Sequence, residues 1–245
     1  IHFRIIPEVI YDIGATIMFG TDSFLEAYAL HSHAYDFYSI KYVISGVEKL
    51  KEQTQQTWFR KFGIRILESY GITEASLAVS INTPMYNKVG SVGKLLPKIE
   101  YFLQPVDGIH NGGKLYIKGP NIMLGYIKPE NPGVIESPYS KGLGKEWHNT
   151  GDIAHIDSEG YINILGRNEF FVTISGEVIS LLAIEDFINK IYNDRFNNVA
   201  TCITDTRGEK QILLFTTKKD LTKEKIAREI KKISVSKLHI PETIV

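Results

Sequence analysis

Five consecutive residues in the first third of the chain combine an aromatic ring, a hydroxyl group and a carboxylate. They are Tyr70-Gly71-Ile72-Thr73-Glu74, and they follow the apolar run Ile64–Leu67, which is typical of a strand. The glycine can adopt backbone angles closed to other residues, so we expect a sharp turn there. Hydroxyls and backbone amides suit phosphate oxygens, a carboxylate suits Mg²⁺, and the Tyr70 ring offers a face for a base. A strand followed by a polar turn without a ligand fits the same spacing.

The composition excludes several classes of protein. The 245 residues include 43% hydrophobic and 23% charged residues, as in globular domains, and Lys+Arg and Asp+Glu balance at 28 each. This balance gives no net field that would recruit nucleic acid. The single cysteine, Cys202, fits a reducing compartment, and no signal peptide or membrane-spanning run is present. The chain begins at Ile1 without a methionine, so we expect it to belong to a longer protein.

Up to residue 88, predicted strands and helices alternate. Apolar runs predict strands at Ala15–Gly20 and Tyr42–Gly46, and an amphipathic helix is expected over Lys49–Lys61. This alternation predicts an α/β layer with a parallel sheet. Ligands of such sheets bind at the carboxyl ends of strands. We therefore expect Ser45–Glu48 and Tyr70–Glu74 to lie next to each other.

Two further regions follow. Over residues 89–165, short strands such as Leu115–Lys118 and Tyr161–Ile164 alternate with glycine and proline turns, which predicts a small β-barrel. Residues 166–245 predict a separate α+β unit. Its expected elements are a helix over Ser180–Ile191, strands over Val199–Thr204 and Gln211–Thr217, and a basic helix over Thr222–Ile233.

Three motifs occur in a recognisable order along the chain. Tyr70–Glu74 is followed by Trp147-His148-Asn149-Thr150-Gly151-Asp152 and then by Gly166-Arg167…Gly176-Glu177. Together they resemble the adenylate-forming, or AMP-binding, superfamily of acyl-CoA synthetases, luciferases and peptide-synthetase adenylation domains. The resemblance implies an α/β fold with a parallel α/β layer (1–88), a distorted β-barrel (89–165) and a truncated C-terminal α+β lid (166–245).

Four other segments are similar to one branch of this superfamily. They are Tyr35–Tyr38, Ser45–Leu50, Gly119–Tyr126 and Lys128–Val134. The branch consists of acyl-[acyl-carrier-protein] synthetases joined to 2-acylglycerophosphoethanolamine acyltransferases, which reacylate lysophospholipid in bacteria. The resemblance implies that ATP and a fatty acid give acyl-AMP, and that acyl carrier protein, or CoA, takes the acyl group. It also implies action together with the rest of the synthetase, in the cytoplasm and at the cytoplasmic face of the inner membrane.

The resemblance also implies roles for individual residues. Tyr70 would stack on adenine, Thr73 would bond the α-phosphate, and Glu74 would hold Mg²⁺, which makes Thr73 and Glu74 the catalytic residues. Asp152 would accept from the ribose hydroxyls, Arg167 would reach the ribose or phosphates, and Glu169 would be the hinge. The implied nucleotide contacts are Gly46, Val47, Glu48, Tyr70, Gly71, Ile72, Thr73, Asp152, Ile164 and Arg167. As alternatives, Asp152 could cap a turn and Arg167 could form a surface ion pair.

The chain also departs from the family pattern. The family's Ser/Thr/Gly-rich phosphate loop lies upstream of this segment, its C-terminal catalytic lysine would follow Val245, and Thr173 replaces a common lysine. We therefore expect this polypeptide by itself to be inactive or nearly so. The alternatives are a fragment of a fatty acyl-CoA synthetase, a non-catalytic nucleotide- or partner-binding module, or an unrelated α/β scaffold.

Overall fold

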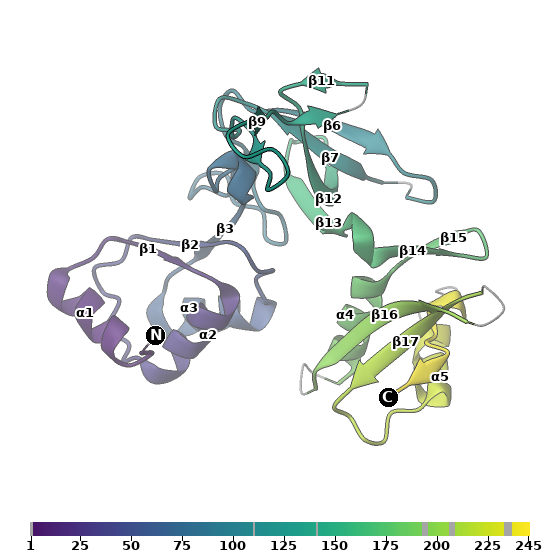
Figure 1. The fold of residues 1–245 in the computed structure, drawn as a ribbon. Helices are drawn as coiled ribbons and strands as arrows, with labels where there is room; N and C mark the ends of the chain where they lie inside the picture. Colours follow the sequence, from purple (N-terminus) through teal and green to yellow (C-terminus); the bar gives the residue numbers. More distant parts are fainter. Residues whose placement is uncertain (1, 110, 141, 193–195, 206–208, 233–236) are drawn as a thin grey trace. The chain divides into compact units, whose positions relative to one another are not determined.

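The computed structural model describes residues 2–109, 111–140, 142–192, 196–205, 209–232 and 237–245. The chain forms two compact units (Figure 1). The first comprises Ile1–Phe102, Tyr116–Thr150 and His155–Ile164. The second comprises Leu103–Leu115, Gly151–Ala154 and Leu165–Val245.

The first unit contains the predicted parallel strands. They lie in a five-stranded sheet of order β1-β2-β3-β4-β5, in which β1, β2 and β3 are parallel and β4 and β5 add antiparallel. The strands are β1 (Ile17–Gly20), β2 (Tyr42–Ser45), β3 (Ile66–Tyr70), β4 (Ser80–Ile81) and β5 (Lys94–Leu95). The predicted parallel α/β layer is confirmed. Strand β3 extends three residues beyond Leu67, so Tyr70 is its last residue.

Three helices form the core of this unit together with the parallel strands: α1 (Ile5–Ile13), α2 (Asp22–His31) and α3 (Glu52–Phe62). Helix α3 is mostly polar, and Trp58 is its large buried side chain, with 0% exposure. The Trp58 indole N–H donates to the Leu25 carbonyl of α2 at 2.8 Å, and its ring contacts Phe37 and Phe62. Trp58 therefore joins α2 and α3, and the Lys61 ammonium adds a hydrogen bond to the Ala29 carbonyl of α2 at 2.6 Å.

The strands that the sequence predicted for a distorted barrel form an open sheet and short hairpins. The sheet has the order β13-β12-β7-β6, and the hairpins pair β8 with β9 and β10 with β11. Their bounds are β6 (Glu100–Pro105), β7 (Gly113–Lys118), β8 (Tyr126–Ile127), β9 (Ile135–Glu136), β10 (Tyr139–Ser140), β11 (Gly144–Lys145), β12 (His148–Ile156) and β13 (Ile162–Arg167). Among the described residues, no closed barrel forms because β13 and β6 are the free ends of the sheet.

The second unit contains the predicted α+β segment. Its core is formed by α4 (Leu181–Ile191), α5 (Lys223–Lys232), β16 (Asn198–Thr204) and β17 (Lys210–Thr216), with β18 (Thr243–Ile244) parallel to β17 (Figure 1). The predicted end of the last helix, Ile233, lies outside the described residues. Before α4, the hairpin β14 (Phe171–Ile174)–β15 (Glu177–Ser180) turns at Ser175-Gly176, whose φ angles of 50° and 82° match a type I′ turn.

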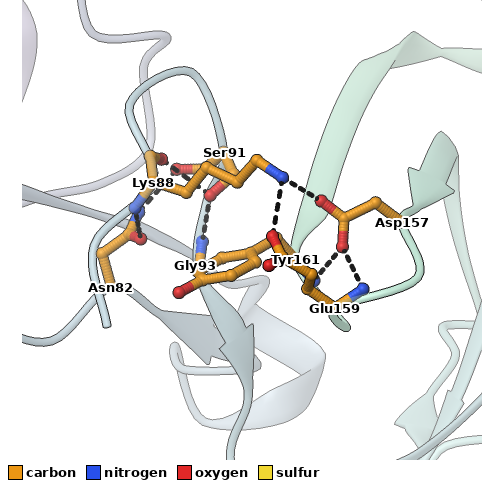
Figure 2. Close-up of polar contacts among 7 residues, drawn as sticks. All are labelled: Asn82, Lys88, Ser91, Gly93, Asp157, Glu159 and Tyr161. Carbon is orange, nitrogen blue, oxygen red and sulfur yellow. Dashed lines mark hydrogen bonds and ion pairs between the residues drawn. The ribbon is translucent and has the colours of Figure 1, made fainter. Parts of the chain in front are cut away.

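One polar network in the first unit holds the loop between β4 and β5. Figure 2 shows Lys88 of this loop reaching Asp157 and Glu159, with Nζ–oxygen distances of 2.6 and 3.2 Å. The Lys88 backbone N–H donates to Asn82 Oδ1 at 3.0 Å, and Asn82 Nδ2 donates to the Ser91 carbonyl at 2.6 Å. The network thus joins the β4–β5 loop to the turn before β13. None of the helices among the described residues is long and apolar enough to cross a membrane.

The Lys88–Asp157 pair predicts a pH dependence of stability. The hydrogen bond from Lys88, helped by the Tyr161 and Glu159 backbone N–H groups, lowers the pKa of Asp157 to about 2 from 3.8. A carboxyl whose pKa is lower in the folded state stabilises the fold above its unfolded pKa, and this stability is lost as the pH falls through the folded pKa. Lys88→Met should therefore lower the free energy of unfolding at neutral pH, and its deficit should shrink between pH 3.8 and about 2.

Urea unfolding of both proteins across this range measures the difference. Lys41→Met, at an exposed lysine of the same unit, is the control. A Lys88→Met deficit that stays constant down to pH 2 would contradict the assignment.

Candidate functional site

The carboxyl ends of β2 and β3 lie next to each other. Ser45 pairs with Glu68 in the parallel register, and the Ser69 hydroxyl donates to the Ser45 carbonyl at 2.9 Å. A Cβ on Gly46 would lie 3.0 Å from Ser69 Oγ, so the glycine permits this close approach. The loop beginning at Gly46 and the turn after Tyr70 therefore leave the same edge of the sheet, as the sequence predicted.

The loop after β2 contains a strained residue and is hydrogen-bonded to α2. Val47 has φ of 73° and is 84% exposed, which is an unusual conformation for a β-branched residue. The Glu48 carboxylate accepts from the Ser23 backbone N–H at 3.0 Å and from its hydroxyl at 3.2 Å. Glu48 thereby caps the first turn of α2. The Glu48 side chain is thus bonded to the helix. The part of this loop that remains available to a ligand is the backbone of Gly46–Glu48.

The turn after β3 depends on Gly71 for a reason that differs from the sequence prediction. Gly71 does not adopt a left-handed φ; Ser76 and Leu77 do, with φ of 51° and 77°. The chain folds back so closely that a Cβ on Gly71 would lie 1.1 Å from the Leu77 carbonyl oxygen. The prediction of special backbone angles at Gly71 is therefore wrong. The glycine is required by the close approach of a neighbouring carbonyl.

Within this turn, Thr73 and Glu74 lie in the short 3₁₀ helix η1 (Thr73–Ala75). Ile72 and Ala75 are buried, with 8% and 0% exposure, and Thr73 is exposed. The buried pair anchors the turn, and Thr73 lies on its exposed side. The Glu74 carboxylate accepts from the Tyr126 hydroxyl at 2.8 Å, and the Glu74 carbonyl accepts from the Met123 N–H at 2.7 Å.

A distant segment, Gly119–Tyr126, holds this turn, and we call it the support segment. Besides Met123 and Tyr126, it contributes Asn121, whose Nδ2 donates to the carbonyls of Ala75 and Ala78, both at 2.8 Å. The Ser76 hydroxyl donates back to the Asn121 carbonyl at 3.1 Å. Turn and support segment are thus joined by hydrogen bonds in both directions.

His148 is a buried imidazole in the electrostatic field of Glu74. Burial lowers the pKa of His148, and the Glu74 carboxylate acts in the opposite direction. Burial also raises the pKa of the Tyr126 hydroxyl, and Glu74 adds to the effect. Tyr126 therefore stays protonated, and its O–H donates a hydrogen bond to the carboxylate.

In the second unit, Asp152 and Arg167 form an ion pair. Arg167 Nε lies 3.1 Å from Asp152 Oδ1, and the aspartate side chain is 6% exposed while that of Arg167 is 51% exposed. Gly151 has φ of 77°, and a Cβ there would lie 3.2 Å from Arg167 Nη1. Asp152 therefore lies in strand β12 and is paired with the neighbouring strand. The alternative that Arg167 forms an ion pair fits this contact, and the ribose role of Asp152 stays a prediction.

The two remaining predicted residues have less distinctive surroundings. Ile164 is half-buried in β13. Glu169 is exposed in the 3₁₀ helix η2 (Asn168–Phe170), which follows Arg167 directly. Its position between β13 and β14 agrees with a connection, and its role as a hinge stays a prediction.

The donor set of the turn fits magnesium bound together with a nucleotide. Among the described residues, no group of three or more His, Cys, Asp or Glu side chains could hold a metal. Mg²⁺, however, keeps several waters and is often bound by one or two carboxylates plus substrate phosphates. Glu74 provides one such carboxylate, beside the exposed hydroxyl of Thr73.

Three residues of the site, Asn121, Met123 and Tyr126, were not predicted from the sequence. The support segment appeared in the sequence only as a similarity to one branch of a family. The bonds from Asn121 Nδ2 and from the Tyr126 hydroxyl join residues 46, 43 and 52 positions apart. A local pattern carries no signal for such contacts.

The sequence that contains these loops matches a known family. A family model described as "AMP-binding enzyme" matches residues 2–127, which include both strand-end loops, the turn and the support segment. The chain belongs to the AMP-binding enzyme family. It is 32% identical over 160 residues to the long-chain-fatty-acid–CoA ligase of Escherichia coli, covering 62% of this chain and 27% of the ligase. It is 30% identical over 146 residues to that of Yersinia pestis, covering 58% and 25%. The aligned part is thus about a quarter of these relatives.

Solved structures show the same fold. O-succinylbenzoate coenzyme A synthetase (MenE) from Bacillus subtilis, in complex with ATP and magnesium, matches with a TM-score of 0.80 and 20% identity. The match covers 100% of this chain and 50% of the synthetase. The fold is therefore that of adenylate-forming enzymes, over half of such a chain.

Gly71→Ala tests the close approach in the turn. The added methyl group would overlap the Leu77 carbonyl, so we expect the free energy of unfolding to fall by about 3 kcal/mol. Gly133→Ala is a matched control, because Gly133 has φ of 92° but nothing within 4 Å of its Cβ position. This control should cost about 1 kcal/mol from backbone strain alone. Urea unfolding gives both values, and equal losses would show that the steric argument fails.

Proposed function

We propose that this protein is the AMP-binding part of a ligase that activates a fatty acid as acyl-AMP. The observation that carries the proposal is the Thr73–Glu74 turn. It lies at the carboxyl end of a parallel strand, inside the region that matches the family, and presents a hydroxyl beside a firmly held carboxylate. The relatives named as long-chain-fatty-acid–CoA ligases support a fatty acid as the acid substrate.

The first unit supplies adenine and phosphate contacts in this proposal. Tyr70, at the end of β3, stacks on adenine, and the exposed backbone of Gly46–Glu48 lies along the base. Backbone groups of Gly71 and Ile72 line the same turn. The Thr73 hydroxyl bonds the α-phosphate, and Glu74 binds Mg²⁺, which neutralises charge on the phosphates. The MenE structure has the same fold and was solved with ATP and magnesium, which supports the proposal of both ligands.

We propose Asp152 for the ribose contact. Asp152 accepts hydrogen bonds only, so its carboxylate suits the two ribose hydroxyls. Arg167, ion-paired with Asp152, orients that carboxylate and contributes positive charge toward the ribose or phosphates. Ile164 contributes an apolar contact to the nucleotide, and Glu169 is the hinge of the lid.

The reaction proceeds in two displacements. A fatty acid carboxylate oxygen attacks the α-phosphorus of ATP, the bond to the bridging oxygen breaks, and pyrophosphate leaves. The resulting acyl-AMP is a mixed anhydride. A thiolate then attacks the acyl carbon, and AMP leaves with the bonding electrons. Glu74 and Thr73 act in the first displacement, where negative charge accumulates on the α-phosphate.

The acceptor thiol has two candidates. The similarity of the branch segments favours acyl carrier protein and, through it, lysophospholipid reacylation. The curated relatives are CoA ligases and favour CoA. The proposal includes a cytoplasmic location, at the inner face of the membrane for the whole protein, where the free thiol of Cys202 would stay reduced. To identify the acceptor, the whole synthetase is supplied with ATP, fatty acid and both acyl carrier protein and CoA. The thiol that becomes acylated is the acceptor.

The ribose assignment predicts a specific pattern of affinities. Wild-type protein should bind AMP more tightly than 2′,3′-dideoxy-AMP by about tenfold, since a hydrogen bond to a carboxylate is lost. Asp152→Asn should weaken AMP binding by about the same factor and leave dideoxy-AMP binding unchanged. Isothermal titration calorimetry of the full chain with both nucleotides measures the four affinities.

Asp107→Asn, at an exposed aspartate of the same unit, is the control and should behave as wild type. Equal losses of both nucleotides in Asp152→Asn would refute ribose binding and indicate a structural role for the Arg167 pair. Failure of wild-type protein to bind AMP at millimolar concentration would overturn the proposed function itself.

A further inference from the structure

The Glu74 carboxylate is held by a residue that lies outside its own turn. Tyr126 is 52 positions away in the chain, and its hydroxyl donates to Glu74 Oε1 at 2.8 Å. A carboxylate accepts only, so the donor is the tyrosine. The remainder of the turn is fixed through its backbone by Met123 and Asn121 of the support segment. Tyr126, of the same segment, donates to the carboxylate itself.

Tyr126 is itself fixed in place. It begins β8, where it pairs with Glu136 of β9, and Lys128 in the same hairpin forms an ion pair with Glu136. The preceding residue, Gly125, packs so closely on this hairpin that a Cβ there would lie 2.2 Å from the Glu136 carbonyl oxygen. The Tyr126 hydroxyl thus projects from a tightly packed hairpin. It can therefore hold the flexible Glu74 side chain in one position.

A glutamate in solution samples many rotamers, and ordering it costs conformational entropy. A hydrogen bond to one carboxylate oxygen restricts the rotamers before the metal binds, so less entropy is lost on binding. Mg²⁺ demands near-ideal octahedral geometry and tolerates misplaced ligands poorly. Residues that orient a metal ligand typically change metal affinity by about tenfold or more when they are removed.

We propose that Tyr126 is a positioning residue for Glu74, and that the contact sets how strongly Mg²⁺ promotes nucleotide binding. This inference rests on the proposed function, in which Glu74 binds Mg²⁺. Tyr126 acts through the glutamate and needs no contact with the nucleotide. The support segment therefore contributes to magnesium binding without supplying a ligand.

The test uses Tyr126→Phe, which removes only the hydroxyl and keeps the ring. Affinity for ATP is measured by calorimetry with the full chain, once with EDTA and once with millimolar Mg²⁺, and the ratio is the magnesium response. Tyr126→Phe should reduce this ratio by about tenfold. The affinity in EDTA should stay unchanged, whereas a general loss of folding would weaken both.

Two comparisons make the result specific. Tyr101→Phe is the matched control, because Tyr101 and Tyr126 are both 46% exposed in the same unit, and it should keep the wild-type ratio. Glu74→Gln should lower the ratio further, and adding Tyr126→Phe to it should change nothing more, because contacting residues couple in a double-mutant cycle.

The outcomes separate the two proposals. A normal ratio in Tyr126→Phe with a reduced ratio in Glu74→Gln would overturn the positioning role alone. Additive effects of the two substitutions would also overturn it. A wild-type ratio in Glu74→Gln, or no ATP binding by the chain, would overturn magnesium binding by Glu74 and the positioning role with it.

Discussion

The Leu77 carbonyl oxygen occupies the space that a side chain on residue 71 would need, and the geometry of the functional edge follows from that approach. Because the chain doubles back so tightly after β3, Thr73 and Glu74 lie in a single 3₁₀ turn directly beyond the sheet. The tight fold also leaves backbone carbonyls of the turn pointing away from it. Asn121 of the support segment takes up two of them, Ala75 and Ala78, through one amide group. A buried or half-buried carbonyl left without a donor would cost free energy.

The carboxylates of this protein differ in the kind of group that they are paired with. Glu48 caps α2 through Ser23, and Asp157 binds Lys88 at a turn, so each is explained by local stability. The Glu74 carboxylate accepts a hydrogen bond from a neutral hydroxyl, that of Tyr126. Asp152 is paired with a half-exposed guanidinium.

The sequence by itself determined the fold class and the outline of the site. The parallel strands read as apolar runs, so β1, β2 and β3 and the helix between β2 and β3 were predictable. Their order placed Gly46 and Tyr70 at one edge of the sheet, because parallel neighbours end on the same side. Three short motifs in order indicated the AMP-binding family, which the match over residues 2–127 confirmed. These features are local patterns or a sequence of local patterns.

Tertiary structure alone decided what holds the chemical groups in place. The glycine at 71 was predicted for its freedom of rotation, yet it is needed because another carbonyl approaches it from six residues ahead. The support of Glu74 by Tyr126 and of the turn by Asn121 joins residues 43 to 52 positions apart. The expected barrel is an open sheet, because closure depends on how distant strands pair rather than on their individual patterns. Local sequence encodes which segments become strands and turns. Which distant hydrogen-bonding groups meet is settled only when the core packs and each buried polar group must find a partner.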